Sequence, residues 1–233
     1  MNCIITGATK GIGRAILEKF AKEGANVAFC ARNQADVEQT IIDLKKHFPT
    51  VKIIGEVVDM SKKEAVKAFG EKILSQWDKV DVLVNNVGVF KEGWVTTEEE
   101  GTLELQMETN VYSAYYMTRA VLSAMKPHRS GHIFNICSIA SLEIYAEAHS
   151  YSISKFAMLG LSRAQRKELK GDGIKVTAIL PGATWSASWG NAPLPVERLT
   201  AAADIAQAVW SAYQLPATAV VEEMVIRPQL GDL

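Results

Sequence analysis

A tyrosine and a lysine stand four residues apart in the segment Tyr151-Ser-Ile-Ser-Lys155. On a helix, residues at this spacing are neighbours on one face. A free phenol has a pKa of about 10 and is a poor base at neutral pH, but a nearby ammonium favours the phenolate. The pair could therefore exchange a proton with an alcohol or carbonyl oxygen. By itself, the same spacing is also typical of a solvated helix face.

A serine follows the apolar run 132–137, which has the pattern of a buried strand. The hydroxyl of this residue, Ser138, could donate a hydrogen bond to a substrate oxygen and polarise a carbonyl. Cys137 directly before it could act as a nucleophile, but we expect it to be a thiol packed within the strand.

Three glycines lie in the segment Thr6-Gly-Ala-Thr-Lys-Gly-Ile-Gly13, with the spacing GxxxGxG. An apolar strand precedes this segment and an amphipathic helix follows it. In such a turn the backbone N–H groups can approach a pyrophosphate, whose charge is favoured by the helix N-terminus. The segment therefore predicts a dinucleotide site that includes Gly7, Lys10, Gly11, Ile12 and Gly13.

The type of dinucleotide is decided at the end of the second strand, where the adenosine ribose arrives. This chain has Cys30-Ala-Arg-Asn33 there, with no carboxylate to bind the 2′-hydroxyl of NAD. Arg32 follows the strand, and Lys10 could approach the same region. Each cation alone could be a solvated surface residue. Together they suit a 2′-phosphate, so we expect NADP(H) as the cofactor.

Short β-branched runs alternate with amphipathic segments along the chain. The expected strands cover 2–6, 27–30, 51–58, 80–84, 132–137, 174–180 and 220–226, and the expected helices cover 13–22, 35–47, 62–77, 109–125, 149–170 and 203–213. Thr97 and Glu100 have the spacing of a capping box, which predicts another helix start near Glu98. The alternation predicts a single α/β domain over residues 1–233, doubly wound and Rossmann-type, with a parallel sheet of about seven strands flanked by helices.

Charge and hydropathy give no indication of a nucleic-acid or membrane partner. The chain has 25 Lys and Arg against 26 Asp and Glu, scattered along its 233 residues. This pattern provides neither a basic face for nucleic acid nor a polybasic membrane anchor, so we expect neither partner. No apolar stretch reaches the roughly 18 residues of a membrane helix. Because the first expected strand begins at residue 2, we expect no signal peptide. The cysteines Cys3, Cys30 and Cys137 are interpreted as buried free thiols, and we expect a cytoplasmic protein.

None of the four histidines pairs with Cys, Asp or Glu at a metal-ligand spacing, so no metal site is expected. His149 either edges a substrate pocket or begins a solvent-exposed helix. Trp94, Trp185 and Trp189 follow expected strand ends, where ligands bind in such sheets. They either form an apolar substrate wall or pack a lid.

Taken together, the motifs resemble the short-chain dehydrogenase/reductase family. They are Thr6–Gly13, Asn85-Asn-Val-Gly88, Asn110, Ser138, Tyr151 with Lys155, and Pro181-Gly182. Their order and spacing match the family over nearly the whole chain. The resemblance implies an oxidoreductase that transfers a hydride between NADP(H) and a small alcohol or carbonyl substrate.

The resemblance also implies a role for each motif residue. Ser138 would orient the substrate, and Tyr151 would donate or accept the proton. Lys155 would lower the pKa of the tyrosine and hold the nicotinamide ribose, while Asn110 would hold a water that links Lys155 to solvent. The other residues expected at the cofactor are Gly7, Lys10, Gly11, Ile12, Gly13, Arg32, Asp59 at the adenine, Met60, Asn86, Gly88, Pro181, Gly182, Thr184 and Ser186.

The chain departs from the family pattern at three positions. Val87 replaces the usual alanine of Asn-Asn-Ala-Gly, Cys137 stands where a serine often precedes the catalytic one, and Ser186 replaces a threonine. None of these changes removes a reacting group.

Two alternative functions stay open. One is a 3-oxoacyl-acyl-carrier-protein reductase, although the ending Val221–Pro228 lacks the Thr-Gly and Gly-Gly strand usual in those enzymes. The other is a module that senses a dinucleotide without catalysis, although such relatives generally lack the tyrosine or the lysine. Family members commonly form tetramers or dimers, so we expect a homo-oligomer.

Overall fold

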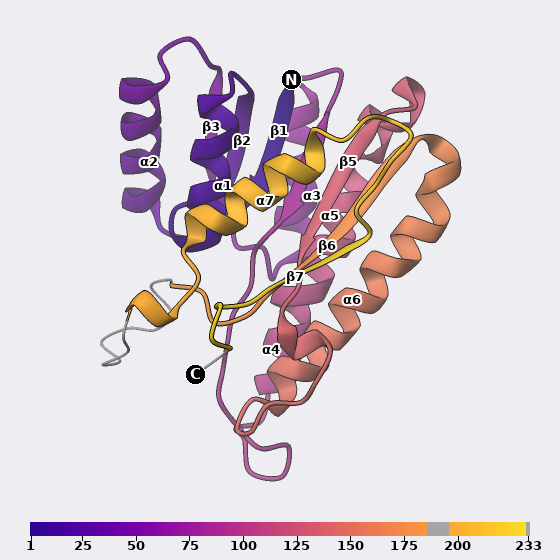
Figure 1. Cartoon of the computed structure of the whole chain (residues 1–233). Coiled ribbons are helices and arrows are strands. Elements are labelled where there is room, and N and C mark those ends of the chain that lie inside the picture. The colour runs from indigo at the N-terminus through magenta and orange to yellow at the C-terminus, as the bar shows by residue number, and fades with distance from the viewer. Residues whose placement is uncertain (186–195, 232–233) are drawn as a thin grey trace.

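Seven parallel strands form one sheet in the order β3-β2-β1-β4-β5-β6-β7 (Figure 1). The computed structural model describes residues 1–185 and 196–231. The strands are β1 (Asn2–Thr6), β2 (Asn26–Ala31), β3 (Ile53–Val57), β4 (Val82–Asn85), β5 (Gly131–Ile136), β6 (Ile174–Pro181) and β7 (Glu223–Ile226). This sheet confirms the expected doubly wound fold. The last strand begins at Glu223, three residues later than predicted.

Helices cover both faces of the sheet. They are α1 (Gly11–Lys22), α2 (Gln34–His47), α3 (Lys63–Leu74), α4 (Thr102–Met107), α5 (Ser113–Val121), α6 (His149–Leu169) and α7 (Ala202–Tyr213). None of the helices in the described ranges combines the length and the hydropathy that a membrane span requires.

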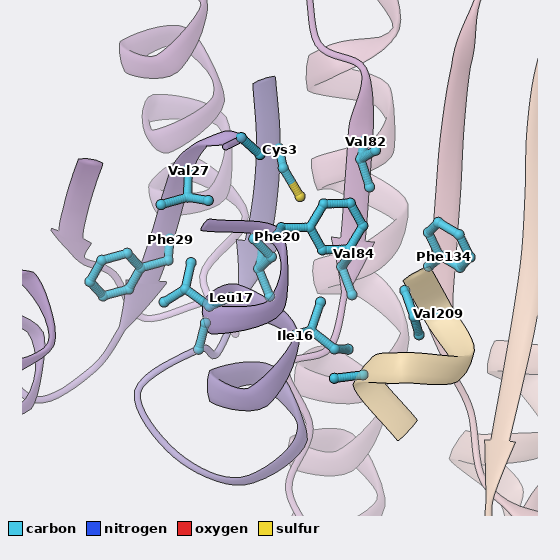
Figure 2. Packing of buried hydrophobic residues seen from close by; sticks show 14 of the residues in the cluster. Cys3, Ile16, Leu17, Phe20, Val27, Phe29, Val82, Val84, Phe134 and Val209 are labelled. Carbon is cyan, nitrogen blue, oxygen red and sulfur yellow. The ribbon is translucent and has the colours of Figure 1, made fainter. Parts of the chain in front are cut away.

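Alternation along the strands divides the core into two layers. On β1, Cys3 and Ile5 face α1, α2 and α7, where Phe20 and Val209 are fully buried (Figure 2). Ile4, between them, faces the opposite layer with α3 and α5. Because successive strand residues point to opposite faces, a strand buried on both sides is apolar throughout. This explains why residues 3–5 in β1, 27–30 in β2 and 82–84 in β4 are short runs without a polar residue.

The segment that precedes α5 differs from the sequence prediction. The helix predicted to start near Glu98 begins at Thr102, after Gly101 with φ +87°. The capping box predicted for Thr97 and Glu100 therefore does not start this helix, and the Glu98 carboxylate accepts a hydrogen bond from the hydroxyl of Ser150. The helical region predicted over 109–125 is present, but it is not one regular α-helix. A π-helical turn, η1 (Glu108–Tyr112), precedes α5, and a 3₁₀ turn follows it at Leu122–Ala124.

A buried ring of polar side chains joins β4 and β5 to α5 and α6. The Asn85 amide nitrogen donates to Thr118 Oγ1 at 3.1 Å and to Asn135 Oδ1 at 2.9 Å. The Asn135 amide nitrogen donates to Gln165 Oε1 at 2.9 Å, and Gln165 Nε2 donates to Thr118 Oγ1 at 3.1 Å. Side-chain hydrogen bonds of this kind are directional, so the ring fixes both helices relative to the sheet.

Asn86, directly after β4, supports the glycine turn between β1 and α1. Its Nδ2 donates to the carbonyl oxygens of Thr6 and Gly7, each at 2.9 Å. The packing leaves no space for a side chain at Gly13, where a Cβ would lie 2.3 Å from Asn86 Nδ2 and 2.5 Å from the Gly7 carbonyl oxygen. The first of these atoms could move, but the second is backbone.

We therefore expect Gly13→Ala to lower the free energy of unfolding by about 1–3 kcal/mol, as overpacking does. The matched control is Gly160→Ala in α6, where a Cβ would meet nothing within 4 Å. That change should be neutral or stabilising by up to about 1 kcal/mol, because alanine is the better helix former. Urea titrations of the two variants measure the difference, and equal stability would contradict the packing argument.

His132 is a neutral histidine inside the fold. Burial lowers its pKa to about 3, and the positive charge of Lys175 contributes. Thr177 Oγ1 donates its proton to the Val221 carbonyl at 2.6 Å, so it accepts from His132 Nε2 at 2.7 Å. The Nδ1 atom is therefore unprotonated, and it has no hydrogen-bond partner among the described residues.

This histidine makes stability depend on pH. Its pKa is about 6.5 in an unfolded chain, so between pH 6.5 and 3 the unfolded state binds the extra proton. The stabilising contribution is complete above pH 6.5 and falls as the pH is lowered, by up to about 1.4 kcal/mol per unit. Urea unfolding at pH 7 and pH 5 measures this loss. His132→Leu should show a smaller loss, and an unchanged loss would refute the assignment.

Candidate active site

The polar motif residues gather at one edge of the sheet. The strands β1, β4 and β6 are followed directly by Gly7, Asn86 and Gly182, and one residue separates Ser138 from the end of β5. All seven strands are parallel, so their carboxyl ends share this edge. The strand order reverses between β1 and β4, which is where ligands bind in doubly wound sheets.

Tyr151 and Lys155 lie on the first two turns of α6, as the spacing predicts. The Lys155 side chain is 5% exposed, and its Nζ lies 5.6 Å from the centre of the Tyr151 ring. The ammonium donates a hydrogen bond to the Ile136 carbonyl oxygen at 3.0 Å, which ties α6 to the end of β5. The tyrosine itself is partly exposed, so a substrate can reach it.

Asn110 lies in the π-helical turn η1, buried beside Lys155. Its Oδ1 accepts from the Val89 backbone nitrogen at 2.7 Å, and its Nδ2 donates to the Val89 carbonyl at 3.0 Å and to Ser154 Oγ at 2.9 Å. A π turn inserts one residue into the helical ladder and is frequent at functional sites. The side-chain amide of Asn110 therefore joins three segments: the residues after β4, the turn η1 and the helix α6.

Gly88 leaves space between these groups. A Cβ built on it would lie 3.5 Å from Asn110 Oδ1 and 3.7 Å from Lys155 Nζ. The glycine thus brings the backbone after β4 into contact distance of both polar groups.

Ser138 is partly buried and begins a short 3₁₀ turn at Ile139–Ser141. Its Oγ accepts a hydrogen bond from the Ala140 backbone nitrogen at 3.1 Å, and its own nitrogen donates to Ser141 Oγ at 3.3 Å. Accepting from Ala140 fixes the direction of the hydroxyl and leaves its proton available for donation.

The glycine turn has the geometry of an anion site. Gly7 has φ +67° and Gly11 has φ +57°, which glycine adopts without strain. Lys10 is the N-cap residue of α1, and among the described residues no side chain caps the first turn, which contains no acid. The N–H groups of this first turn and the positive end of the helix dipole favour a negative charge. A phosphate group fits this turn.

Lys10 and Arg32 both lie near the start of α2. Lys10 Nζ forms an ion pair with Asp36 in the first turn of α2 at 2.8 Å, with 62% of the lysine side chain exposed. Arg32 is exposed just before Asn33, whose side chain caps the same helix. The structure therefore brings two cations, and one acid, to one helix start. The presence of Asp36 beside the two cations was not predicted from the sequence.

Asp59 and Met60 follow β3. Partial burial acts to raise the pKa of Asp59, but hydrogen bonds from Ser61 and the charges of Lys62 and Arg32 outweigh it, so the pKa is lowered. Ser61 supplies both its backbone nitrogen, at 3.0 Å, and its hydroxyl, at 2.8 Å. Met60 is buried in the core beneath α3. Asp59 is thus a fixed, charged acceptor at the sheet edge.

The segment after β6 is held by backbone pairing. The Gly182 nitrogen donates to the Ile226 carbonyl at 2.8 Å, and Thr184 pairs with Thr200 in a parallel bridge. Thr184 Oγ1 also donates to the Gly182 carbonyl at 2.9 Å. Ser186 and Trp189 lie outside the described residues.

The cysteines are packed thiols, as expected. Burial raises the pKa of Cys137 to about 12, and burial likewise raises that of Cys30 to about 12. A thiol with such a pKa is protonated at neutral pH and is a poor nucleophile. Within the described ranges, no cluster of three His, Cys, Asp or Glu side chains could hold a metal ion.

Two residues at the site were missed in the sequence. Phe90 places its ring edge-on to Tyr151, with centroids 5.0 Å apart, and Ser154 accepts the hydrogen bond from Asn110. Ser154 precedes Lys155, but every helix has polar residues at such positions. Phe90 follows Gly88 by two residues, and only the path of the chain reveals its contact.

Comparisons with known proteins agree with this architecture. The family model described as short chain dehydrogenase matches residues 2–193. A sepiapterin reductase from Chlorobaculum tepidum is 31% identical over 238 residues, covering 99% of this chain and 97% of that protein.

Two solved structures extend the comparison. The alcohol dehydrogenase from the archaeon Thermococcus sibiricus, complexed with 5-hydroxy-NADP, is 27% identical with a TM-score of 0.92, covering 100% of this chain and 98% of that one. The L-sorbose reductase from Gluconobacter frateurii, complexed with NADPH and L-sorbose, is 25% identical with a TM-score of 0.89, covering 97% and 94%. Because the family match spans most of the chain and the sheet order agrees with it, this protein belongs to the short chain dehydrogenase family.

Proposed function

We propose that this protein is an NADP(H)-dependent oxidoreductase that interconverts an alcohol and a carbonyl compound, with Tyr151 as the acid/base. The observation that carries the proposal is the buried ammonium of Lys155 beside the Tyr151 ring, 5.6 Å from its centre. A nearby positive charge favours the phenolate, which is the form that accepts a proton from an alcohol.

The bound cofactor would supply or accept the hydride; the residues of this chain handle the proton. In reduction, the Tyr151 hydroxyl gives its proton to the developing alkoxide. Ser138, whose Oγ already accepts from the Ala140 nitrogen, donates its own proton to the same substrate oxygen. Lys155 stabilises the phenolate that remains, and Asn110 keeps the backbone around Gly88 and Val89 in place.

Charge at the start of α2 supports NADP(H) over NAD(H). Arg32 is exposed directly after β2, and Lys10 reaches the same helix start. Two cations suit a 2′-phosphate, for which a guanidinium can offer two parallel hydrogen bonds. The Thermococcus and Gluconobacter relatives, which were solved with NADP-type cofactors, support the same choice.

Two further expectations stay proposals. The fatty-acid reductase alternative is the weaker one, because the strand β7 segment lacks the glycines usual in those enzymes. Assembly into a homo-oligomer is supported by large apolar side chains exposed in η1 and α6, namely Tyr112, Ile153 and Phe156.

Tyr151→Phe should lower kcat by about 100- to 10,000-fold, the range that general acid/base catalysis contributes. The dissociation constant for NADPH should stay unchanged, because the ring and Lys155 are retained. NADPH oxidation with a panel of ketones measures the first quantity, and fluorescence titration measures the second. Tyr115→Phe, an exposed tyrosine on α5, is the control. Retained activity in Tyr151→Phe would refute the mechanism, and NADPH binding by the unaltered protein without any turnover would favour the sensor alternative.

Arg32→Ala should weaken NADPH binding by about tenfold to 100-fold, the loss expected for a hydrogen bond to a charged group. NADH, which lacks the 2′-phosphate, should bind equally well to both proteins. Lys46→Ala, which removes an exposed cation from the other end of α2, is the matched control. Calorimetric titration with each dinucleotide gives the four dissociation constants. An equal loss for NADH would contradict the proposed phosphate contact.

A further inference from the structure

Two aromatic side chains of the loop after β4 stand exposed near the start of α6. Phe90 is 48% exposed and Trp94 is 44% exposed, although the large apolar residues of the strands are mostly buried. Phe90 packs edge-on against Tyr151 with ring centres 5.0 Å apart. Trp94 packs against His149, two residues before Tyr151, at 4.7 Å. We refer to Phe90 and Trp94 as the aromatic wall.

The aromatic wall is held in place by the start of α6. The Gly93 nitrogen donates to the Glu147 carbonyl at 2.8 Å, and the His149 nitrogen donates to the Gly93 carbonyl at 3.1 Å. The loop before α4 and the loop before α6 accordingly lie side by side (Figure 1). Glu98 adds the hydrogen bond from Ser150. A wall fixed in this way loses little conformational entropy when a ligand binds to it.

Other apolar side chains surround the same sheet edge. Leu142 and Ile144 are exposed in the segment between Ser138 and Tyr151, and Trp185 is exposed shortly after β6. These segments follow β5, which pairs with β4, and β6, which pairs with β5. An exposed apolar surface that continues up to a reactive group is the usual character of a ligand site.

Charge restricts what can bind there. The segment 88–101 has one cation, Lys91, and four acids, Glu92, Glu98, Glu99 and Glu100. The segment 139–150 has Glu143 and Glu147 but neither lysine nor arginine. Arg227 forms an ion pair with Glu143 at 2.8 Å, so these two charges offset each other and the remaining acids give the two segments their negative charge. The net negative charge of these two segments repels an anionic ligand.

We propose that the substrate is an uncharged carbonyl compound with an aromatic ring next to the C=O group, and that this ring packs on the aromatic wall. Aromatic rings prefer edge-to-face or offset contacts with one another, and the exposed parts of Phe90 and Trp94 can make such contacts. The surrounding acids repel a ligand that carries a carboxylate, a phosphate or another anionic group beside its carbonyl. This inference rests on the proposed function and specifies its substrate class.

The reaction balances without a further reactant. The C=O π bond breaks, the carbonyl carbon receives a hydride from NADPH, and the oxygen receives the proton of Tyr151. The ketone is reduced to a secondary alcohol, and NADPH is oxidised to NADP⁺. The Tyr151 phenolate then recovers a proton from solvent.

Four 2-oxo compounds separate the two requirements, ring and charge. Ethyl benzoylformate has a ring and no charge, benzoylformate has the same ring and a carboxylate, and ethyl pyruvate and pyruvate have a methyl group in place of the ring. With NADPH and the full chain, we expect kcat/KM for ethyl benzoylformate to exceed each of the others at least about tenfold, the factor that 1.4 kcal/mol provides. Added salt should narrow the gap between ester and acid, because it screens charge repulsion.

Two variants test the wall itself. Trp94→Ala should lower kcat/KM for ethyl benzoylformate about tenfold, mainly through KM, and should leave ethyl pyruvate unaffected. Trp94→Phe should restore most of the loss. Ile42→Ala removes an apolar side chain that is 59% exposed on α2 and serves as the matched control. Melting temperatures verify that each variant is folded.

The outcomes distinguish this inference from the proposed function. Turnover of ethyl pyruvate or benzoylformate as fast as ethyl benzoylformate overturns the substrate class and leaves the oxidoreductase function standing. An equal effect of Trp94→Ala on both esters also overturns the wall. No turnover of any of the four compounds overturns the substrate class alone, because the proposed function is tested separately by turnover of other ketones in the panel.

Discussion

A buried ammonium is the constraint on which the rest of this site depends. A charge removed from water is stable only where hydrogen bonds and nearby polar groups replace its hydration. Lys155 meets this need with the Ile136 carbonyl oxygen and the Tyr151 ring, and Gly88 after β4 packs beside its ammonium. Each of these partners comes from a different part of the chain. The position of the lysine therefore fixes how β5, α6 and the segment after β4 must meet.

The remaining architecture serves to hold those three segments together. The ring formed by Asn85, Asn135, Gln165 and Thr118 attaches α5 and α6 to the centre of the sheet. Nearer the carboxyl ends of the strands, the amide of Asn110 connects segments in the same way, through hydrogen bonds with Val89 and Ser154. Buried amides tolerate few alternative arrangements, since an unpaired one is costly. Rigidity at the sheet edge thus follows from polar groups inside it.

Much of this could be predicted from the sequence, because the relevant patterns are local. Apolar runs of β-branched residues mark the strands, and the spacing of Tyr151 and Lys155 places them on one helix face. The π turn around Asn110 could not be predicted, because it depends on a contact with Val89 across 21 residues. The hydrogen bond from Ser150 to Glu98, which are 52 residues apart in the sequence, was missed for the same reason. The spacing of Thr97 and Glu100 indicated a helix start that the folded chain does not use.

The ion pair between Lys10 and Asp36 alters how charge recognition operates at the start of α2. The lysine already has an anion, so an incoming phosphate must share or displace a carboxylate. The binding free energy of the phosphate is then the difference between two ion pairs of Lys10, one with the phosphate and one with Asp36. Both pairs are exposed to solvent and screened by salt. Selectivity in such an exchange reflects the geometry of the competing anions more than the total positive charge. The protein thus carries an internal competitor for the ligand that its cations attract.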